Sequence, residues 1–332
     1  MKRAQKILEL LYSRRGQAVS FSELSAASGL NIAKLHSALD DLIHSGQRLE
    51  ILPAHGVLLH WPIRLDAHLI EAGLQTQRVG RNVICFDEVG STNDVAFDSA
   101  RQARSDGLVV LAESQHKGRG RLGRKWISPP GCNILMSVLL VDEQNTLAHE
   151  ALTIAAGLAV AEGIDGACRV DCRLKWPNDV LLDGSKLSGV LVEIKNVPLS
   201  AQGKAPTRKS RRCVVIGIGI NVNTAPPRNE LTSPAVSLAG HLEAAVERVE
   251  VIREILARLD HWIDCISRGE LPALHDAWMA RSDMIGQRIS LRCEGIRYTG
   301  RVLDISPLEG LLLCRDEGPP VHLPAKGSSL AD

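Results

Sequence analysis

Several kinds of residue and pattern are scarce in this chain of 332 residues. Aromatic side chains make up 3% of it, and 39 basic residues against 38 acidic ones leave a net charge of +1. A chain so close to neutral offers no overall attraction for nucleic acid or for an anionic membrane surface. Any such interaction must therefore come from a local cluster of charge.

The sequence also lacks long apolar runs and paired cysteines. No uninterrupted apolar stretch approaches the roughly 20 residues that span a bilayer, and the N-terminus has the pattern of an amphipathic helix without a signal-cleavage site. The eight cysteines are scattered, with no CxxC and no cysteine/histidine spacing typical of zinc sites. We therefore expect a soluble protein that does not enter a membrane and that resides in the cytoplasm with reduced thiols.

The chain does contain a basic, glycine-rich loop, residues 114–137. Its cationic side chains alternate with glycines; they are Arg119, Arg121, Arg124 and Lys125, with Gly118, Gly120 and Gly123. Glycine allows backbone N–H groups to approach a ligand, and arginine offers forked donors that suit carboxylate and phosphate. These residues favour a loop that closes over an anion, although an ordinary solvated basic loop has the same composition.

Two nucleotide-binding motifs share this glycine spacing and are excluded. The three glycines spell GxGxxG, but that fingerprint requires a helix to begin at the loop. Pro129 and Pro130 follow too soon for a helix to form. The P-loop interpretation fails for the same reason, and because Arg124 stands where that motif requires a lysine.

Four further segments accompany this loop in a fixed order. They are Ser91-Thr92-Asn93 before it and, after it, Lys175-Trp176-Pro177-Asn178-Asp179, Lys186-Leu187-Ser188-Gly189 and Gly217-Ile218-Gly219-Ile220-Asn221. As a set, they closely resemble the biotin protein ligases over about residues 80–325. The resemblance implies an ATP-dependent ligase that activates biotin as biotinyl-5′-adenylate. It also implies transfer of biotin to a lysine of the biotin carboxyl carrier protein of acetyl-CoA carboxylase.

The resemblance also implies a role for each matched residue. The biotin contacts that it implies are Ser91, Thr92, Asn93, Gln115, Arg119, Gly120, Arg121, Lys186 and Gly189. The nucleotide contacts that it implies are Arg121, Arg124, Trp126, Asn178 and Asn221. Lys186, Arg121 and Asp179 are the expected catalytic residues, and Asp179 is also the expected ligand of a Mg²⁺ ion that bridges the phosphates.

Each of these roles has a plainer alternative. The turn at Ser91 could simply cap a helix, and Lys186 could be a surface lysine in a turn. Trp126 could be a core aromatic residue, and Asp179 a turn residue. The order of the matched segments, rather than any single residue, favours the ligand contacts.

Residues 1–63 show the pattern of a winged helix-turn-helix and resemble that domain of the bifunctional ligase-repressors. Apolar residues recur at helical spacing in a first helix, in a second helix with a serine cap near Phe21, and in a third from Ile32 to His44. Residues 48–62 are expected to form the strands of the wing. The third helix would contact operator DNA near its start, through Asn31, Lys34, His36 and Ser37.

The charge of this N-terminal segment is modest, since seven basic residues against five acidic ones leave +2. Phosphate contacts supply much of the affinity for DNA, so a folded domain without regulatory function stays an alternative. The resemblance favours a repressor of biotin-synthesis genes that binds DNA as a homodimer, with the adenylate as corepressor. A biotin-sensing transcription factor without catalysis would not need Asp179 and Lys186, and the usual motifs of a lipoate ligase are not seen.

The expected fold class is α+β, in three domains. They are a winged helix-turn-helix (1–63), a catalytic domain (64–282) and a small SH3-like β-barrel (283–332). Strands of the middle domain cluster without strict alternation with helices, and the resemblance implies the mixed sheet of class II aminoacyl-tRNA synthetases. The barrel either is structural only or helps to hold nucleotide and carrier protein. Residues 196–212 are expected to form a flexible surface insertion whose five basic residues could also contact nucleic acid.

Overall fold

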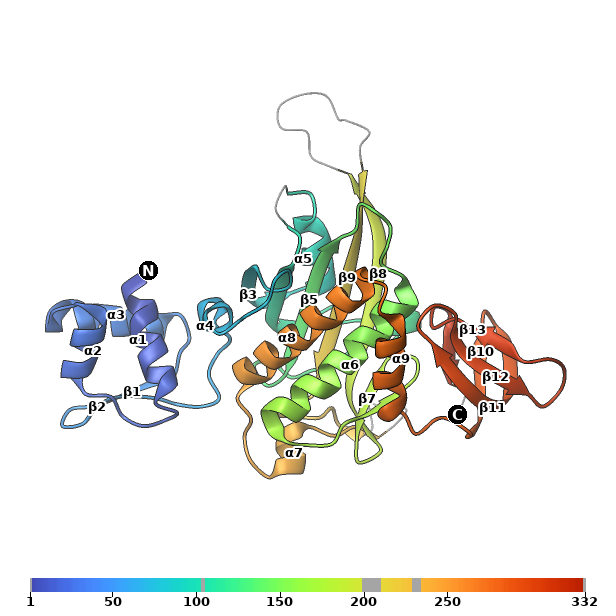
Figure 1. Cartoon of the computed structure of the whole chain (residues 1–332). Coiled ribbons are helices and arrows are strands. Elements are labelled where there is room, and N and C mark those ends of the chain that lie inside the picture. Colours follow the sequence, from blue (N-terminus) through green and yellow to red (C-terminus); the bar gives the residue numbers. More distant parts are fainter. Residues whose placement is uncertain (1, 103–104, 199–209, 229–233, 331–332) are drawn as a thin grey trace.

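The computed structural model describes residues 2–102, 105–198, 210–228 and 234–330 (Figure 1). In these residues, three β-sheets follow one another along the chain, and helices pack with the first two. Figure 1 shows the N-terminal unit in blue, the large central sheet in the middle and the C-terminal sheet in red. The architecture is therefore mixed α+β, which confirms the predicted class.

The N-terminal unit combines three short helices with a hairpin. Its elements are α1 (Lys2–Ser13), α2 (Phe21–Ser28), α3 (Ile32–His44), β1 (Leu49–Leu52) and β2 (Gly56–Leu59). Helix α2 begins after Ser20, which forms a reciprocal capping box with Glu23. Helix α3 begins after Asn31, whose side chain accepts the Lys34 amide at 3.0 Å. These elements lie where the sequence predicted helices and strands.

The central sheet has seven strands in the order β3-β4-β5-β9-β8-β7-β6. Its strands are β3 (Asn82–Val89), β4 (Leu108–Gln115), β5 (Ile134–Val141), β6 (Arg173–Lys175), β7 (Asp179–Leu182), β8 (Ser185–Pro198) and β9 (Ser210–Ile220). Strands β3 and β4 are parallel because helix α5 (Thr92–Ser99) crosses between them, and the other neighbours are antiparallel. The sheet is therefore mixed, as the resemblance implied.

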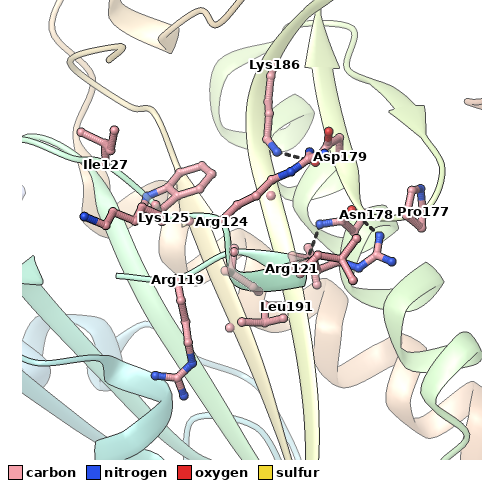
Figure 2. A pocket seen from close by; sticks show the side chains of 18 of the residues that line it. Arg119, Arg121, Arg124, Lys125, Ile127, Pro177, Asn178, Asp179, Lys186 and Leu191 are labelled. Carbon is pink, nitrogen blue, oxygen red and sulfur yellow. Dashed lines mark hydrogen bonds and ion pairs between the residues drawn. The ribbon is translucent and has the colours of Figure 1, made fainter. Parts of the chain in front are cut away.

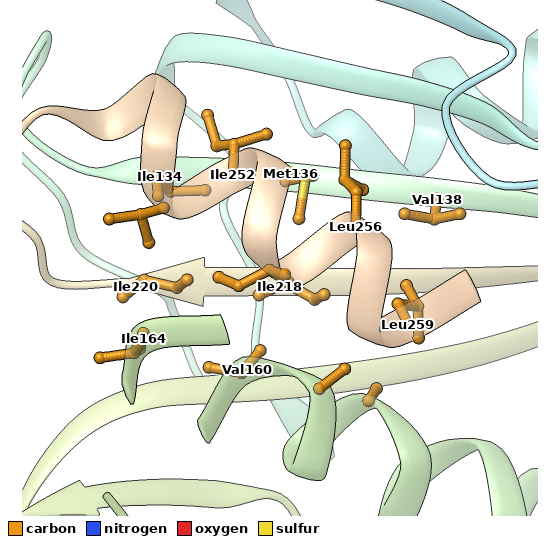
Figure 3. Packing of buried hydrophobic residues seen from close by; sticks show 14 of the residues in the cluster. Ile134, Met136, Val138, Val160, Ile164, Ile218, Ile220, Ile252, Leu256 and Leu259 are labelled. Carbon is orange, nitrogen blue, oxygen red and sulfur yellow. The ribbon is translucent and has the colours of Figure 1, made fainter. Parts of the chain in front are cut away.

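Helices cover both faces of this sheet. Successive strand residues point to opposite sides, so the strands offer apolar side chains to both layers of helices. On one face lie α6 (His149–Cys168) and α8 (Arg248–Ser267), where Ile164 and Leu256 pack with strand residues such as Ile218 (Figure 3). Helix α9 (Leu271–Ala280) packs against both of them, and α4 (Ala67–Ala72) lies against α8. On the opposite face, Phe97 of α5 packs with a separate apolar cluster.

Helix α6 is the one helix of the described residues that is long and apolar enough to cross a membrane, with a mean hydropathy of 1.4 over 18 residues. Its acidic residues interrupt the apolar run, which is why the sequence shows no uninterrupted stretch of that length. In the structure, 72% of this 18-residue stretch is buried. A helix that is apolar on all sides and packed between a sheet and other helices is a core helix.

The C-terminal sheet is antiparallel, in the order β13-β12-β11-β10-β14. Its strands are β10 (Arg288–Cys293), β11 (Ile296–Ser306), β12 (Gly310–Arg315), β13 (Val321–Leu323) and β14 (Ser328–Leu330). The first four lie where the sequence predicted strands. Strand β14 was missed because it follows a glycine and begins with two serines, which are typical of turns. The five-residue helix α7 (Leu238–Leu242) was missed because it is too short to show helical periodicity.

The prediction of a flexible insertion over residues 196–212 is wrong at both ends, because β8 continues to Pro198 and β9 begins at Ser210. Val197 packs in the apolar cluster beneath α5, and Arg211 donates to a backbone carbonyl at the end of α5. These contacts favour continued pairing of the two strands. The rest of the predicted insertion lies outside the described residues, with Lys204, Arg208 and Lys209.

A buried ion pair holds the segment that connects the N-terminal unit to the central sheet. Arg248 of α8 is 1% exposed, and its guanidinium contacts the carboxylate of Glu113 on β4 at 2.5 and 3.1 Å. The guanidinium also donates to the carbonyls of Ile63 (3.0 Å) and Asn133 (3.2 Å). Glu113 accepts the amide of Leu65 at 2.7 Å. The pair therefore fixes the connecting segment against both ends of the glycine-rich loop, which runs between β4 and β5.

We expect Glu113→Ala to lower the free energy of unfolding by about 3–5 kcal/mol, because it leaves the buried guanidinium of Arg248 without its counter-charge. Urea denaturation followed by circular dichroism measures the change. The matched control is Asp316→Ala, which removes an exposed ion pair with Arg288 and should lower the free energy of unfolding far less, because water screens exposed pairs. Equal losses in the two variants would contradict the prediction.

Candidate active site

A cavity of about 520 Å³ opens over the central sheet. It is bounded by the glycine-rich loop, the turn before α5, strands β7, β8 and β9, and strand β14 of the C-terminal sheet. Each residue predicted to contact biotin, nucleotide or magnesium lines it: Ser91, Thr92, Asn93, Gln115, Arg119, Gly120, Arg121, Arg124, Trp126, Asn178, Asp179, Lys186, Gly189 and Asn221. The fold thus brings together residues that lie far apart in the sequence.

The glycine-rich loop folds back on itself as a small hairpin. The amide of Trp126 donates to the carbonyl of Gly118 at 3.1 Å, and that of Gly120 to the carbonyl of Arg124 at 2.7 Å. A single 3₁₀ turn, η1 (Arg121–Gly123), forms its tip. The chain then continues without a helix until β5 begins, which confirms that neither the dinucleotide fingerprint nor the P-loop applies.

The polar turn before α5 is held by two neighbouring strands. The Gln115 side-chain oxygen accepts the Thr92 amide at 2.7 Å, and the Ser137 hydroxyl lies 2.7 Å from the Thr92 hydroxyl and 2.5 Å from Asn93 Oδ1. Ser91 occupies the N-cap position of α5, but its side chain makes no capping hydrogen bond. Ser91 therefore does not act as a side-chain helix cap, which was the plainer alternative for this turn, and its hydroxyl is free to bind another partner.

Arg119 is held by carboxylates in this structure. Its guanidinium donates to both oxygens of Asp94, at 2.8 and 2.7 Å, and to Glu193 at 3.0 Å. The hydrogen bonds between the two side chains lower the pKa of Asp94 and raise the pKa of Arg119. Asn93 donates to the same Glu193 oxygen at 2.7 Å. The sequence did not point to Asp94 or Glu193: Asp94 adjoins the predicted turn, whereas only strand pairing brings Glu193 of β8 to this place.

Arg121 connects the loop to two distant segments, of which Figure 2 shows the one at Asn178. It donates to the side-chain oxygen of Asn178 at 2.9 Å. It also donates to the backbone carbonyls of Ala325 and Ser328, the latter at 2.7 Å. Burial lowers the pKa of Arg121, and nearby carboxylates oppose that shift. The C-terminal sheet therefore contributes residues to the wall of the cavity.

Lys186 and Asp179 form an ion pair between the neighbouring strands β8 and β7 (Figure 2). The Lys186 ammonium lies 2.6 Å from the Asp179 carboxylate, and their side chains are 29% and 27% exposed. The ammonium also lies 5.9 Å from the centre of the Trp126 ring. Neither residue is a freely solvated surface residue, so the plainer alternatives for both are disfavoured.

Trp126 packs against bare backbone on β8 and β9. A methyl group added at Gly219 would lie 2.4 Å from the indole, and one added at Gly189 would lie 3.2 Å from it. Gly189 was expected to contact biotin, and in the structure both glycines leave room for the tryptophan. Trp126 Nε1 and Asn221 Oδ1 are buried without a hydrogen-bond partner among the described residues. Both residues line the cavity, so these two polar atoms are available to a bound ligand.

The four residues predicted to contact DNA are all exposed near the start of α3. Two of them also have a local structural role, since Asn31 caps the helix and the His36 ring lies 5.5 Å from the Phe21 ring. Lys34 and Ser37 have exposed side chains on the same helix. All four are therefore accessible near the start of α3, with His36 lying against Phe21 of α2.

Comparisons with known proteins bear on the same region. Residues 85–221 match the model of the biotin/lipoate A/B protein ligase family. The bifunctional ligase/repressor BirA of Bacillus subtilis is 30% identical over 317 residues, which cover 94% of each protein. The biotin–[acetyl-CoA-carboxylase] ligase of Mycobacterium tuberculosis is 35% identical over 246 residues, 70% of this chain and 84% of that protein. The solved structure of biotin protein ligase from Aquifex aeolicus with biotin and ATP has a TM-score of 0.63 at 28% identity, over 76% of this chain and 99% of that one.

We expect Gly219→Ala to displace Trp126 from the cavity wall, because the added methyl group would overlap the indole. The free energy of unfolding should fall by about 1–3 kcal/mol. Acrylamide should also quench the fluorescence of Trp126 more strongly than in the wild-type protein; the Trp126 signal is obtained by subtracting the spectrum of Trp126→Phe. Gly166→Ala is the matched control, since its methyl group would meet only the flexible end of Glu254. Unchanged quenching in Gly219→Ala would refute this packing.

Proposed function

The chain belongs to the biotin/lipoate A/B protein ligase family and is a biotin–protein ligase, and we propose that its cavity carries out both steps of ATP-dependent biotinylation. In the first step, the carboxylate of biotin attacks the α-phosphorus of ATP, and pyrophosphate leaves. In the second, a lysine amine of an acceptor protein attacks the acyl carbon of biotinyl-5′-adenylate, and AMP leaves. The observation that carries this proposal is the meeting of Lys186, Asp179, Arg121 and Trp126 around one cavity.

The first step brings a carboxylate against a triphosphate, so the site must supply positive charge where negative charge builds. Lys186 from β8 and Arg121 from the loop supply it from two separate elements. Their partners hold each cation in a defined orientation before substrates bind. Positioning of the two substrates accounts for much of the remaining catalysis, and neither step requires a covalent enzyme intermediate.

We assign biotin to the part of the cavity near the polar turn and the nucleotide to the part near Trp126. The proposed biotin contacts are Ser91, Thr92, Asn93, Gln115, Arg119, Gly120, Arg121, Lys186 and Gly189, and the proposed nucleotide contacts are Arg121, Arg124, Trp126, Asn178 and Asn221. The partnerless Trp126 Nε1 and Asn221 Oδ1 support this division, because adenine carries both donors and acceptors. Arg119, with its bonds to Asp94 and Glu193, would act by holding the loop over biotin.

Asp179 is the residue that we propose to hold Mg²⁺ when ATP is bound. Magnesium prefers oxygen ligands and is commonly held by one or two carboxylates together with phosphates. Asp179 fits this pattern, because its carboxylate lines the cavity beside Lys186 and the described residues contain no larger cluster of metal-ligating side chains. The ion would add positive charge next to the phosphates.

The acceptor that we propose is the biotin carboxyl carrier protein of acetyl-CoA carboxylase. The name of the M. tuberculosis relative supports this choice, since it specifies acetyl-CoA carboxylase. We also propose that the protein works in the cytoplasm, where thiols stay reduced. Its eight cysteines support this location because all of them are free.

Labelling of a carrier-domain lysine in the presence of biotin and ATP tests the ligase assignment. We expect Lys186→Ala to reduce the rate by about 100-fold or more, because it removes a cation from the site of charge development, and Arg121→Gly to lose activity as well. Lys195→Ala is the matched control, since this lysine lies on the same strand with its ammonium 4.1 Å from the Phe97 ring. Wild-type turnover by Lys186→Ala would refute the catalytic assignment.

We propose that residues 1–63 form a winged helix-turn-helix that represses biotin-synthesis genes as part of a homodimer. Three structural features support the winged helix-turn-helix: the capped helices α2 and α3, the turn at Gly29 (φ +65°) between them, and the β1–β2 hairpin. The name of the B. subtilis relative supports the repressor role. A dimer would match a two-fold operator.

The proposed catalytic domain, with a class II synthetase-like sheet, spans residues 64–282, and a proposed SH3-like barrel spans residues 283–332.

With biotin and ATP present, we expect the protein to retard operator DNA in a gel-shift assay, and the complex to weaken as salt is raised. Lys34→Ala should weaken binding and reduce the salt slope by about one charge. Lys6→Ala, at an exposed position on α1, is the matched control. If the wild-type protein leaves the mobility of the DNA unchanged at low salt, the N-terminal unit has no regulatory role.

A further inference from the structure

A buried carboxylate holds the C-terminal strap, residues 325–330, against the central domain. Glu150 near the start of α6 is 9% exposed, and its carboxylate accepts the amides of Ala325 (2.9 Å) and Lys326 (3.5 Å). A buried charge is costly unless it is hydrogen-bonded, so the carboxylate and the two amides stabilise each other. Glu150 therefore fixes the point at which the chain turns into β14.

The strap in turn orients Arg121. The carbonyls of Ala325 and Ser328 both accept from Nη2, while the side chain of Asn178 accepts from Nη1 at 2.9 Å. A guanidinium is planar and carries its five N–H donors in a fixed fork. Three hydrogen bonds from two of its nitrogens set the plane of the group and leave the remaining donors for a ligand. Both carbonyl groups belong to residues that are almost fully buried, so they cannot swing away without moving the strap.

We propose that Glu150 is a positioning residue for the ligase reaction, because it anchors the strap whose carbonyls orient the guanidinium of Arg121 over the reacting carboxylate and phosphate. The inference rests on the function proposed for this cavity. Glu150 is not one of the residues that line the cavity, so it acts through the strap. Its negative charge also lies near enough to Arg121 to stabilise the charged guanidinium.

Loosening the strap should have two separable consequences. The guanidinium would lose its fixed orientation, so ATP would bind less tightly and adenylate formation would slow. The residues of β14 that line the cavity would also move, which opens a path to solvent for the adenylate. A purely structural role for Glu150 would lower the melting temperature without producing either effect.

The test compares Glu150→Gln with Glu162→Gln in the full-length enzyme. Both variants neutralise a glutamate on α6, but Glu162 accepts a hydrogen bond from Trp262 Nε1 at 3.0 Å, away from the strap. We expect Glu150→Gln to raise the KM for ATP by about tenfold, the effect of losing one charge-assisted hydrogen bond. It should also release free biotinyl-adenylate, measured by chromatography, while Glu162→Gln retains wild-type values of both.

Two further variants test whether Glu150 acts through its charge and through Arg121. Glu150→Asp keeps the charge with a shorter reach, so its KM for ATP should lie between those of wild type and Glu150→Gln; it decides the question if Glu150→Gln fails to fold. On an Arg121→Ala background, which is expected to be inactive, Glu150→Gln should have no additional effect on the Kd for ATP, measured by calorimetry. A full effect on that background, or a folded Glu150→Gln with wild-type KM and no released adenylate, overturns the proposal. Failure of the wild-type enzyme to label the carrier would instead defeat the proposed function.

Discussion

The contact between Glu113 and Arg248 is the constraint on which the arrangement of this chain depends. Both charges are removed from water, and two such charges are tolerated only when they stay together and satisfy their remaining hydrogen bonds. Four segments meet to provide this: the connecting segment at Ile63 and Leu65, strand β4, the start of β5 and the first turn of α8. Because the glycine-rich loop runs from β4 to β5, the ion pair fixes its ends and leaves its tip to be shaped by contacts over the cavity.

Three cations of the site, Arg119, Arg121 and Lys186, share one property, which is that each has fixed partners. Arg119 is held by two carboxylates, Arg121 by an amide oxygen and two backbone carbonyls, and Lys186 by one carboxylate. Cations that are already oriented need little reorganisation when an anionic substrate arrives, and this is the most effective form of electrostatic stabilisation. The strap on the C-terminal sheet belongs to this arrangement as fully as the loop does.

Two glycines of β9, Gly217 and Gly219, form part of the cavity wall on the side of the central sheet. These glycines face side chains of the protein itself, since a methyl group at Gly219 would overlap Trp126 and one at Gly217 would lie 2.5 Å from Asn93 Oδ1. The two side chains sit on different elements, the loop and α5, so a single strand sets the depth at which both enter the cavity. Close approach of side chain to backbone, rather than of ligand to backbone, is the physical reason for glycine at these two positions.

The sequence by itself determined the local structure and the family. The serine cap before Phe21, the prolines after the loop and the alternation along β10–β13 act over a few neighbouring residues, so they can be read directly. The order of the matched segments predicted residues that the structure places around one cavity. Only the tertiary structure decided which groups those residues meet. Glu193 beside Arg119, and the strap beside Arg121, lie tens to hundreds of residues away from their partners, and such separations leave no periodic signal. The extension of β8 and β9 into a polar stretch was hidden for a related reason, because strand pairing depends on register and burial more than on composition.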